Sequence, residues 1–253
     1  MTFTACITGA TSGFGRAAAE KFAQQGWHLL LTGRREERLK EIKEQLSQYT
    51  VVETMVLDVQ DTEACKEKLS QLPPSLAPLK VLVNNAGLAL GTAPAQDASL
   101  DQWHQMIDTN VKGLSTVTYV LLPKLIECGA GASIINIGSI AGLYPYPGGN
   151  VYCGTKAFVE QFSKALRCDL LGTGVRVSNV APGMAETEFT LVRTSGNQQA
   201  SDDLYKGVDA IQASDIADTL LYLANLPDHL NINELEIMPT QQAWSPFAVN
   251  RKS

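Results

Sequence analysis

The sequence lacks both a long apolar run and a block of like charge. A membrane-spanning helix needs roughly 20 consecutive apolar residues, and no segment approaches that length. The chain carries 20 Lys and Arg against 26 Asp and Glu, for a net charge of -6. Nucleic-acid affinity rests largely on clustered cations that neutralise phosphates. We therefore expect neither a membrane nor a nucleic acid as a partner.

Cysteine and histidine are scarce and scattered. The five cysteines form no Cys-x-x-Cys motif, which indicates free thiols in a reducing compartment. The first nine residues lack a basic segment and already reach a glycine turn, so we expect no signal peptide and a cytoplasmic location. His28, His104 and His229 show no metal-ligand spacing, so no metal site is expected.

What the sequence does contain is an alternation of two patterns along all 253 residues. Short β-branched runs alternate with longer helical patterns, which predicts βαβ units and a parallel sheet covered by helices on both faces. A length of 253 residues with 45% hydrophobic content is enough to bury one core, so we expect a single domain over 1–253. The expected strands are Phe3–Thr8, His28–Thr32, Val51–Asp58, Val81–Asn84, Ser133–Ile137, Val175–Val180 and Leu235–Met238.

Helical patterns fill the intervals between these strands. We expect N-caps at Ser99, Asn150 and Ser214. One polar segment, at about 186–206, follows a strand and departs from the alternation, which predicts a mobile loop or a short-helix insertion. It is either a substrate lid or a variable surface excursion. The expected helices are Gly13–Gln25, Glu36–Gln48, Glu63–Gln71, Leu100–Leu125, Val151–Leu171 and Ser214–Leu226.

The first expected strand ends in a glycine turn that runs directly into a helix. Such a turn presents backbone N–H groups and the positive end of the helix dipole to a phosphate. Its glycines allow the backbone to approach a ligand closely. The spacing is Gly-x-x-x-Gly-x-Gly rather than the commoner Gly-x-Gly-x-x-Gly. The turn predicts a nucleotide site at Gly9, Thr11, Ser12, Gly13, Phe14 and Gly15.

Two arginines follow the second expected strand, where an NAD-selective fold would place an acid on the ribose 2′-hydroxyl. A carboxylate would repel a 2′-phosphate, whereas guanidinium groups bind it with charge-assisted hydrogen bonds. Arg34 and Arg35 therefore predict NADP(H) as the cofactor. The alternative is that they only open a charged helix containing Glu36, Glu37 and Arg38.

A phenol and an ammonium lie four residues apart at Tyr152 and Lys156, on one face of an expected helix. The phenol has an ordinary pKa of about 10, and a nearby cation stabilises its ionised form, so the pair can exchange a proton with a carbonyl or alcohol oxygen. Ser139 closes an expected central strand and could hold the same oxygen. Its alternative role is a turn residue or helix cap.

At this point the sequence resembles the short-chain dehydrogenase/reductase family along essentially the whole chain. The resemblance implies a Rossmann-like, doubly wound parallel sheet of about seven strands in the order 3-2-1-4-5-6-7. The joint spacing of the motifs is far more specific than any one of them. The matching motifs are Thr8-Gly9-x-x-x-Gly13-x-Gly15, Asp58-Val59, Asn84-Asn85-Ala86-Gly87, Asn110, Ser139, Tyr152-x-x-x-Lys156 and Pro182-Gly183-x-x-x-Thr187.

The resemblance also implies a role for each matched residue. Tyr152 would donate or accept the proton, and Ser139 would orient the substrate oxygen. Lys156 would bind the nicotinamide ribose and depress the pKa of Tyr152, and Asn110 would support a water relay to Lys156. The remaining matched residues would contact the cofactor: Asp58 and Val59 near the adenine, Asn85, Ala86 and Gly87 near the adenosine ribose, and Pro182, Gly183 and Thr187 near the nicotinamide and pyrophosphate.

Several shorter stretches resemble one branch of this family, the NADP-dependent 3-hydroxy acid (serine) dehydrogenases and the sulfoacetaldehyde reductases. Both groups act on short chains that carry an anion at one end, which implies a small anionic aldehyde or hydroxy acid as substrate. Arg suits such an oxyanion, and Arg193 in the segment at 186–206 is our candidate. Tyr146 would close the other side of the pocket. The alternatives are a solvated arginine and an aromatic packed beside prolines.

The family likeness further implies a homo-oligomer, namely a tetramer. The aromatic tail at 241–247 would either reach a neighbouring subunit or cover the chain's own core. A non-catalytic NADP-binding sensor would usually have lost Tyr152 or Lys156. A serine hydrolase at Ser139 lacks Gly-x-Ser-x-Gly. The closest alternative activity is reduction of neutral carbonyls.

Overall fold

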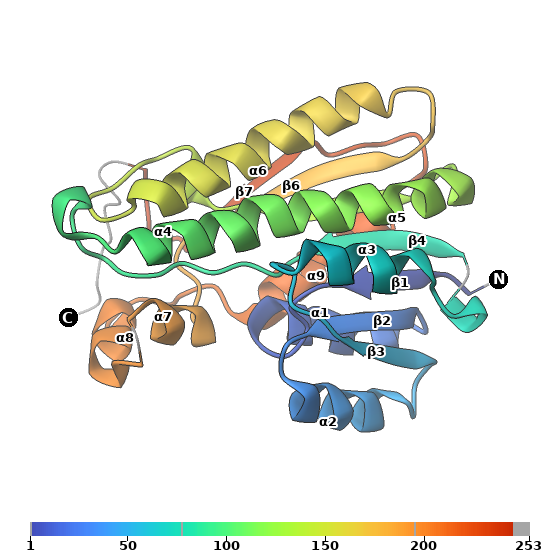
Figure 1. Cartoon of the computed structure of the whole chain (residues 1–253), viewed down its shortest axis with the longest axis horizontal. Helices are drawn as coiled ribbons and strands as arrows, with labels where there is room; N and C mark the ends of the chain where they lie inside the picture. Colours follow the sequence, from blue (N-terminus) through green and yellow to red (C-terminus); the bar gives the residue numbers. More distant parts are fainter. Residues whose placement is uncertain (1, 77, 195, 245–253) are drawn as a thin grey trace.

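The computed structural model describes residues 2–76, 78–194 and 196–244. Within them, seven parallel strands form one sheet in the order β3-β2-β1-β4-β5-β6-β7, as the family likeness implied (Figure 1). The chain runs from β1 outward to β3 and then returns to β4 on the other side of β1, so the strand order reverses between β1 and β4. Ligands of such sheets bind beyond the carboxyl ends of the strands at this reversal.

The strands are short and mostly buried. β5 and β6 are buried at every position, as expected for strands that have helices on both faces. Their bounds lie within two residues of those expected. The strands are β1 (Thr4–Ile7), β2 (His28–Gly33), β3 (Val52–Val56), β4 (Leu79–Asn84), β5 (Ser133–Ile137), β6 (Arg176–Pro182) and β7 (Glu234–Ile237).

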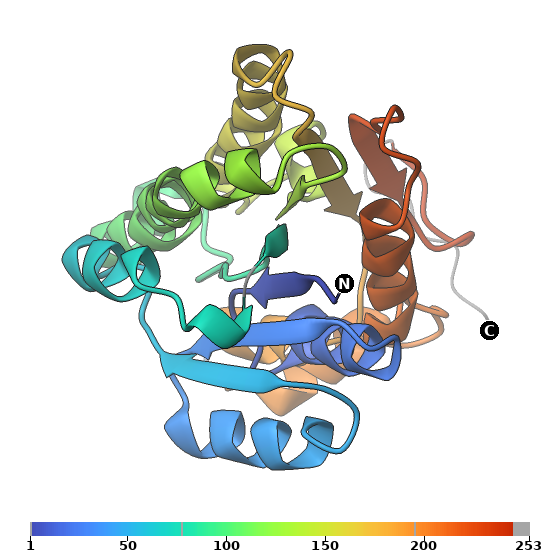
Figure 2. The ribbon, with the colours of Figure 1, turned by 90° about the vertical axis from the view of Figure 1, so that its right-hand side faces the viewer.

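Helices cover both faces of the sheet (Figure 2). On one face α1 (Gly13–Gln24), α2 (Glu36–Leu46) and α9 (Ala213–Ala224) pack on the strands around Phe22 and Leu31. On the other face α3 (Thr62–Ser70), α5 (Leu114–Cys128) and α6 (Asn150–Asp169) bury a second cluster. Each core is built from the apolar stripe of helices and one face of the strands.

The region expected to form one helix at Leu100–Leu125 is divided. It contains α4 (Leu100–Ile107), a π-helical turn at Asp108–Gly113 and then α5. Such wide turns occur most often at functional sites. The wide turn contains Asn110, which is 1% exposed. A period of 3.6 residues does not reveal this insertion, because the apolar stripe continues on both sides of it.

Two of the three expected N-caps are wrong. Ser99 does cap α4, where its side chain accepts a hydrogen bond from the Gln102 N–H. Asn150 is instead the first residue of α6, with a φ of 24°. Ser214 lies inside α9, which is capped by Gln212 and Asp215 in a reciprocal pair of hydrogen bonds. Short polar side chains therefore indicated the region in which a helix begins, but they did not identify the capping residue.

The polar segment at 186–206 contains two short helices, α7 (Glu188–Arg193) and α8 (Gln198–Tyr205). They stand apart from the sheet at the left in Figure 1. Tyr205 anchors them, because its hydroxyl donates to the Ala185 carbonyl oxygen at 2.7 Å and also pairs with Thr190. The described part of this segment is therefore a short-helix insertion.

Of the tail expected to meet a neighbouring subunit, the structure describes residues 241–244. Gln242 is buried, and its side chain accepts a hydrogen bond from the Met184 N–H at 2.8 Å. Trp244 is 59% exposed and donates through Nε1 to Glu236. Pro246 and Phe247 lie outside the described residues.

Candidate active site

A cavity of about 310 Å³ opens at the carboxyl edge of the sheet and gathers most of the predicted site. Among the described residues, four predicted ones lie outside its lining: Gly15, Asn110, Tyr146 and Arg193. The predicted residues that do line it are Gly9, Thr11, Ser12, Gly13, Phe14, Arg34, Arg35, Asp58, Val59, Asn85, Ala86, Gly87, Ser139, Tyr152, Lys156, Pro182, Gly183 and Thr187.

Close backbone packing shapes the glycine turn. A Cβ on Gly9 would lie 2.9 Å from the Ala86 Cα, and one on Gly15 would lie 2.5 Å from both the Gly9 carbonyl oxygen and the Asn85 amide nitrogen. The Asn85 side chain donates to the Thr8 carbonyl oxygen at 2.9 Å. Asn85 and Gly15 therefore pack against the backbone of the turn and fix it. The start of α1, at Gly13 and Phe14, lines the cavity.

The two predicted arginines occupy different surroundings. The Arg34 side chain is 58% exposed and lies 3.7 Å from an Asp58 carboxylate oxygen. Arg35 is held by hydroxyls of the glycine turn: its Nε donates to Thr11 Oγ1 at 3.0 Å, and its Nη2 donates to Thr11 Oγ1 at 2.8 Å and to Ser12 Oγ at 2.6 Å. Only Arg35 is fixed by a set of hydrogen bonds.

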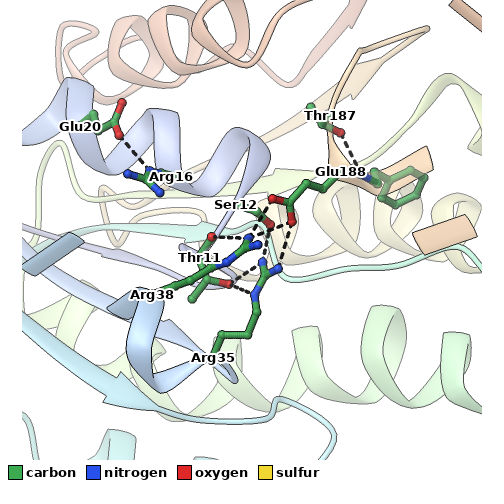
Figure 3. Close-up of polar contacts among 9 residues, drawn as sticks. Thr11, Ser12, Arg16, Glu20, Arg35, Arg38, Thr187 and Glu188 are labelled. Atoms are coloured by element: carbon green, nitrogen blue, oxygen red, sulfur yellow. Dashed lines mark hydrogen bonds and ion pairs between the residues drawn. The ribbon is translucent and has the colours of Figure 1, made fainter. Parts of the chain in front are cut away.

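Two further charged residues, Arg38 and Glu188, lie beside Arg35, and we call these three residues the cofactor corner (Figure 3). The sequence analysis did not include Arg38 or Glu188 in the site. Glu188 of α7 accepts from Arg35 at 3.0 Å and, through both oxygens, from Arg38 at 2.8 and 2.9 Å. Partial burial opposes ionisation of Glu188, but the hydrogen bonds from Arg35 and Arg38 outweigh it and lower its pKa. Arg38 follows Arg35 at helical spacing, a signal the sequence contained. Glu188 is 150 residues away, so no local pattern points to it.

Tyr152 and Lys156 lie on the buried face of α6, because the buried positions of this helix recur every three or four residues. The Lys156 Nζ donates to the Ile137 carbonyl oxygen at 2.7 Å and lies 5.9 Å from the centre of the Tyr152 ring. Ser139 hydrogen-bonds to Tyr152, and its Oγ accepts from the Ala141 N–H at 3.1 Å. Ser139 is thus both a helix cap and a neighbour of the phenol.

Burial decides how these groups titrate. Burial raises the pKa of Tyr152 well above its ordinary value, opposed by the hydrogen bond from Ser139 and the charge of Arg193. Burial also lowers the pKa of Lys156 to about 8. Tyr152 is therefore protonated at neutral pH. The cation that lowers its pKa here is Arg193, a contribution that the sequence analysis did not anticipate.

Asn110 reaches the site from the π-helical turn. Its Nδ2 donates to the Leu88 carbonyl oxygen at 2.8 Å and to Thr155 Oγ1 at 3.0 Å, and its Oδ1 accepts from the Leu88 N–H at 2.9 Å. A Cβ on Gly87 would lie 3.3 Å from Asn110 Oδ1 and 3.7 Å from Lys156 Nζ. Asn110 and Lys156 therefore border the same small space.

The two residues predicted to bind substrate, Tyr146 and Arg193, lie near Tyr152. The Arg193 guanidinium carbon is 5.1 Å from the Tyr146 ring centre and 5.8 Å from the Tyr152 ring centre. Tyr146 and Arg193 share a side-chain hydrogen bond, while burial raises the pKa of Tyr146. The backbone oxygen of Arg193 accepts from the Gly91 N–H at 3.2 Å, which fixes the end of α7. Arg193 is therefore a cation of the site.

Phe189 also faces the phenol, with its ring centre 5.8 Å from that of Tyr152. Phe189 lines the cavity together with Val192, so α7 supplies an apolar wall, whereas Arg193 of the same helix lies outside the lining. The sequence analysis noted the stretch that contains Phe189 but gave this residue no role. A single aromatic residue in a polar segment does not indicate, from the sequence alone, which side chains it will contact in the fold.

The family model for short chain dehydrogenases matches residues 3–198. The chain is 62% identical over 251 residues to sulfoacetaldehyde reductase 2 of Chromohalobacter salexigens, covering 99% of this chain and all of that protein. It is 53% identical to serine 3-dehydrogenase of Rhizobium radiobacter, covering all of both chains.

A solved structure, the closed form of serine dehydrogenase complexed with NADP+, superposes with a TM-score of 0.92 at 44% identity. It covers 99% of this chain and all of that chain. The fold, the matched motifs and the sequence identity over full length agree with one another. The chain belongs to the short chain dehydrogenase family.

Proposed function

We propose that this protein is an NADP(H)-dependent oxidoreductase that interconverts a short anionic aldehyde and its hydroxy acid. The observation that carries the proposal is the placement of a cation, Arg193, beside the catalytic phenol of Tyr152. A carbonyl held at Tyr152 would then have its anionic end within reach of the guanidinium group. Relatives with full-length similarity are named as sulfoacetaldehyde reductase and serine 3-dehydrogenase, which supports this substrate class.

The cavity fits a phosphorylated dinucleotide. A Cβ on Gly33, at the end of β2, would lie 2.7 Å from Thr11 Cγ2, so a larger residue there would displace Thr11 of the turn. The first turn of α1 contains no acidic residue, so its N-terminus favours an anion. Arg34 and Arg35 would hold the 2′-phosphate, and the hydroxyls of Thr11 and Ser12 orient Arg35 toward it. The remaining lining residues of the turn would contact the pyrophosphate.

When bound, the nicotinamide supplies or accepts the hydride. Tyr152 holds the proton that the substrate oxygen receives, and its raised pKa keeps that proton in place until the oxygen becomes basic. Ser139 donates a hydrogen bond to the same oxygen and orients it. Lys156 is fixed on the Ile137 carbonyl oxygen, with further N–H groups available for a ribose. Asn110 would order a water beside Lys156, through which the proton of Tyr152 is replenished.

Arg193 is suited to the anionic end of the substrate. Its Nε is buried and has no hydrogen-bond partner among the described residues. A buried donor without a partner costs free energy that a ligand oxygen would recover. A guanidinium group binds a carboxylate or a sulfonate through two parallel hydrogen bonds. The site therefore favours a short substrate that carries a planar or tetrahedral oxyanion near its carbonyl group.

The experiment that tests this function measures NADPH oxidation with sulfoacetaldehyde, malonic semialdehyde and a neutral aldehyde of similar size. Each is repeated with NADH. We expect kcat/KM to be highest with one of the two acids and with NADPH. Equal kcat/KM for the neutral aldehyde would contradict the anion site and favour a reductase of neutral carbonyls. Equal kcat/KM with NADH would contradict the cofactor assignment.

The described residues also bear on membranes and metal ions. None of the helices in the described ranges is long and apolar enough to cross a membrane. Nor do these residues contain a cluster of His, Cys, Asp and Glu suited to a metal ion.

We propose a single domain over 1–253 with the substrate lid at about 186–206, a homo-oligomeric assembly and a cytoplasmic location. Size measurement in solution tests the assembly.

A further inference from the structure

Two neighbouring arginines, Arg35 of the proposed 2′-phosphate site and Arg38, already hold an anion from the chain itself. Both oxygens of the Glu188 carboxylate accept hydrogen bonds from Arg38, and one of them also accepts from Arg35 (Figure 3). Glu188 is the first residue of α7, while Arg35 caps α2 and Arg38 lies in the first turn of α2. The contact therefore joins the insertion at 186–206 to the cofactor corner.

The hydrogen bonds of Arg35 leave little capacity for a second anion. Its Nε and Nη2 are committed to Thr11 and Ser12, and its Nη1 donates to Glu188. Arg38 directs Nη1 at both carboxylate oxygens and at the Thr11 carbonyl oxygen. A guanidinium group has five N–H donors in a fixed fork. A phosphate that binds Arg35 must displace the carboxylate or share the guanidinium group with it.

We propose that Glu188 is a specificity-determining residue for the cofactor: its carboxylate competes with the 2′-phosphate of NADP(H) for Arg35 and Arg38. The inference rests on the proposed use of NADP(H). A phosphate monoester carries between one and two negative charges at neutral pH. A carboxylate at the same arginines repels it and occupies its donors. Glu188 thus weakens binding of NADP(H) while leaving NAD(H), which has no 2′-phosphate, nearly unaffected.

The exposure of the corner fits a competition rather than a permanent structural pair. The side chains of Arg35, Arg38 and Glu188 are 43%, 39% and 46% exposed. Ion pairs of this exposure contribute little to stability, because water and salt screen them. A divalent anion can therefore replace the carboxylate at low cost. Release of Glu188 would also free the N-terminal end of α7, whose last residue is Arg193.

The test uses ligands that differ only at the 2′ position. Isothermal titration calorimetry measures the Kd of 2′,5′-ADP and of 5′-ADP for the full-length wild type and for Glu188→Gln. We expect the Kd of 2′,5′-ADP to fall about fivefold in Glu188→Gln, and that of 5′-ADP to change less than about twofold. The matched control is Glu186→Gln, which removes the same charge two residues away in an exposed position. Its two Kd values should equal those of the wild type.

A second variant protects the test against misfolding. Glu188→Asp keeps the charge but shortens the reach, so the Kd of 2′,5′-ADP should lie between those of the wild type and Glu188→Gln. Weaker binding of 2′,5′-ADP by Glu188→Gln would overturn the competition. An equal change for both ligands would also overturn it, since a loss of folding affects both. If the wild type and Glu188→Gln both fail to distinguish the ligands, the NADP(H) assignment itself is wrong.

Discussion

The glycine turn and the insertion at 186–206 both face the cavity, but they are built in opposite ways. The turn is held by backbone contacts so close that Gly9 and Gly15 have no room for a Cβ. The insertion is held by side chains from distant parts of the chain, such as Glu188 on Arg35. The first arrangement fixes positions to within a fraction of an ångström, because packed backbone cannot yield. The second is the kind of attachment that the proposed substrate lid would need, since exposed side-chain contacts are weak.

The difference fits the proposed function. The rigid turn would bind the cofactor, and the proposed reactive groups lie on the buried face of α6. The anionic end of the substrate would meet Arg193, Phe189 and Tyr146, which contact the site through side chains. The following predictions test this division, beginning with the reactive centre between the two regions.

Tyr152→Phe should lower kcat by about 10³-fold, because proton transfer by a positioned side chain contributes 10²- to 10⁴-fold. The ring still packs in its buried position, so the Kd of the cofactor should change little. Stopped-flow kinetics and fluorescence titration measure the two quantities. A variant that kept more than a tenth of its turnover would refute the role of Tyr152.

Arg193→Ala should raise KM for an anionic aldehyde by about 10- to 100-fold, since a hydrogen bond to a charged group contributes about 1.5–3 kcal/mol. KM for a neutral aldehyde of the same length should rise less than about threefold. Arg193→Lys is the matched control, because it keeps the charge but loses the planar fork. Equal losses for both substrates would show that Arg193 only supports the lid.

Gly15→Ala should destabilise the fold by about 1–3 kcal/mol, because its Cβ would overlap the Gly9 carbonyl oxygen. The variant should also weaken cofactor binding. The control is Gly154→Ala, another helical glycine, whose Cβ would meet no described atom within 4 Å. That change should be neutral or stabilising, since Ala is the better helix former. Urea denaturation measures both, and equal results would contradict the rigidity of the turn.

Lys156 predicts a rise of stability with pH. Its pKa is about 8 in the folded protein, below the ordinary 10.5, so the unfolded chain binds more protons between these values. The cost of burying the charge is present below pH 8 and is relieved as the pH rises from about 8 toward 10.5. Between pH 7 and 9.5, the free energy of unfolding of the wild type should gain about 1–2 kcal/mol over that of Lys156→Met. Urea denaturation at each pH would show no such gain if Lys156 were solvated.

The fold and the rigid half of the site were predictable because their signals are local. Strand and helix periods placed every strand within two residues, and the glycine spacing identified the turn. Tyr152 and Lys156 share a face because four residues span about one helical turn. The wrong N-caps at Asn150 and Ser214 show the limit, since the first residue of a helix depends on what its backbone meets.

The sequence by itself determined the order of the elements, the glycine turn and the pair on α6, because each depends on residues within about one turn or one strand of each other. Only the tertiary structure decided that Glu188 lies on Arg35 and Arg38, that Arg193 lies beside Tyr152, and that the pKa of Lys156 is about 8. These facts depend on distance in space and on burial, which arise when segments far apart in the sequence, up to 153 residues for Arg35 and Glu188, pack against one another and exclude water.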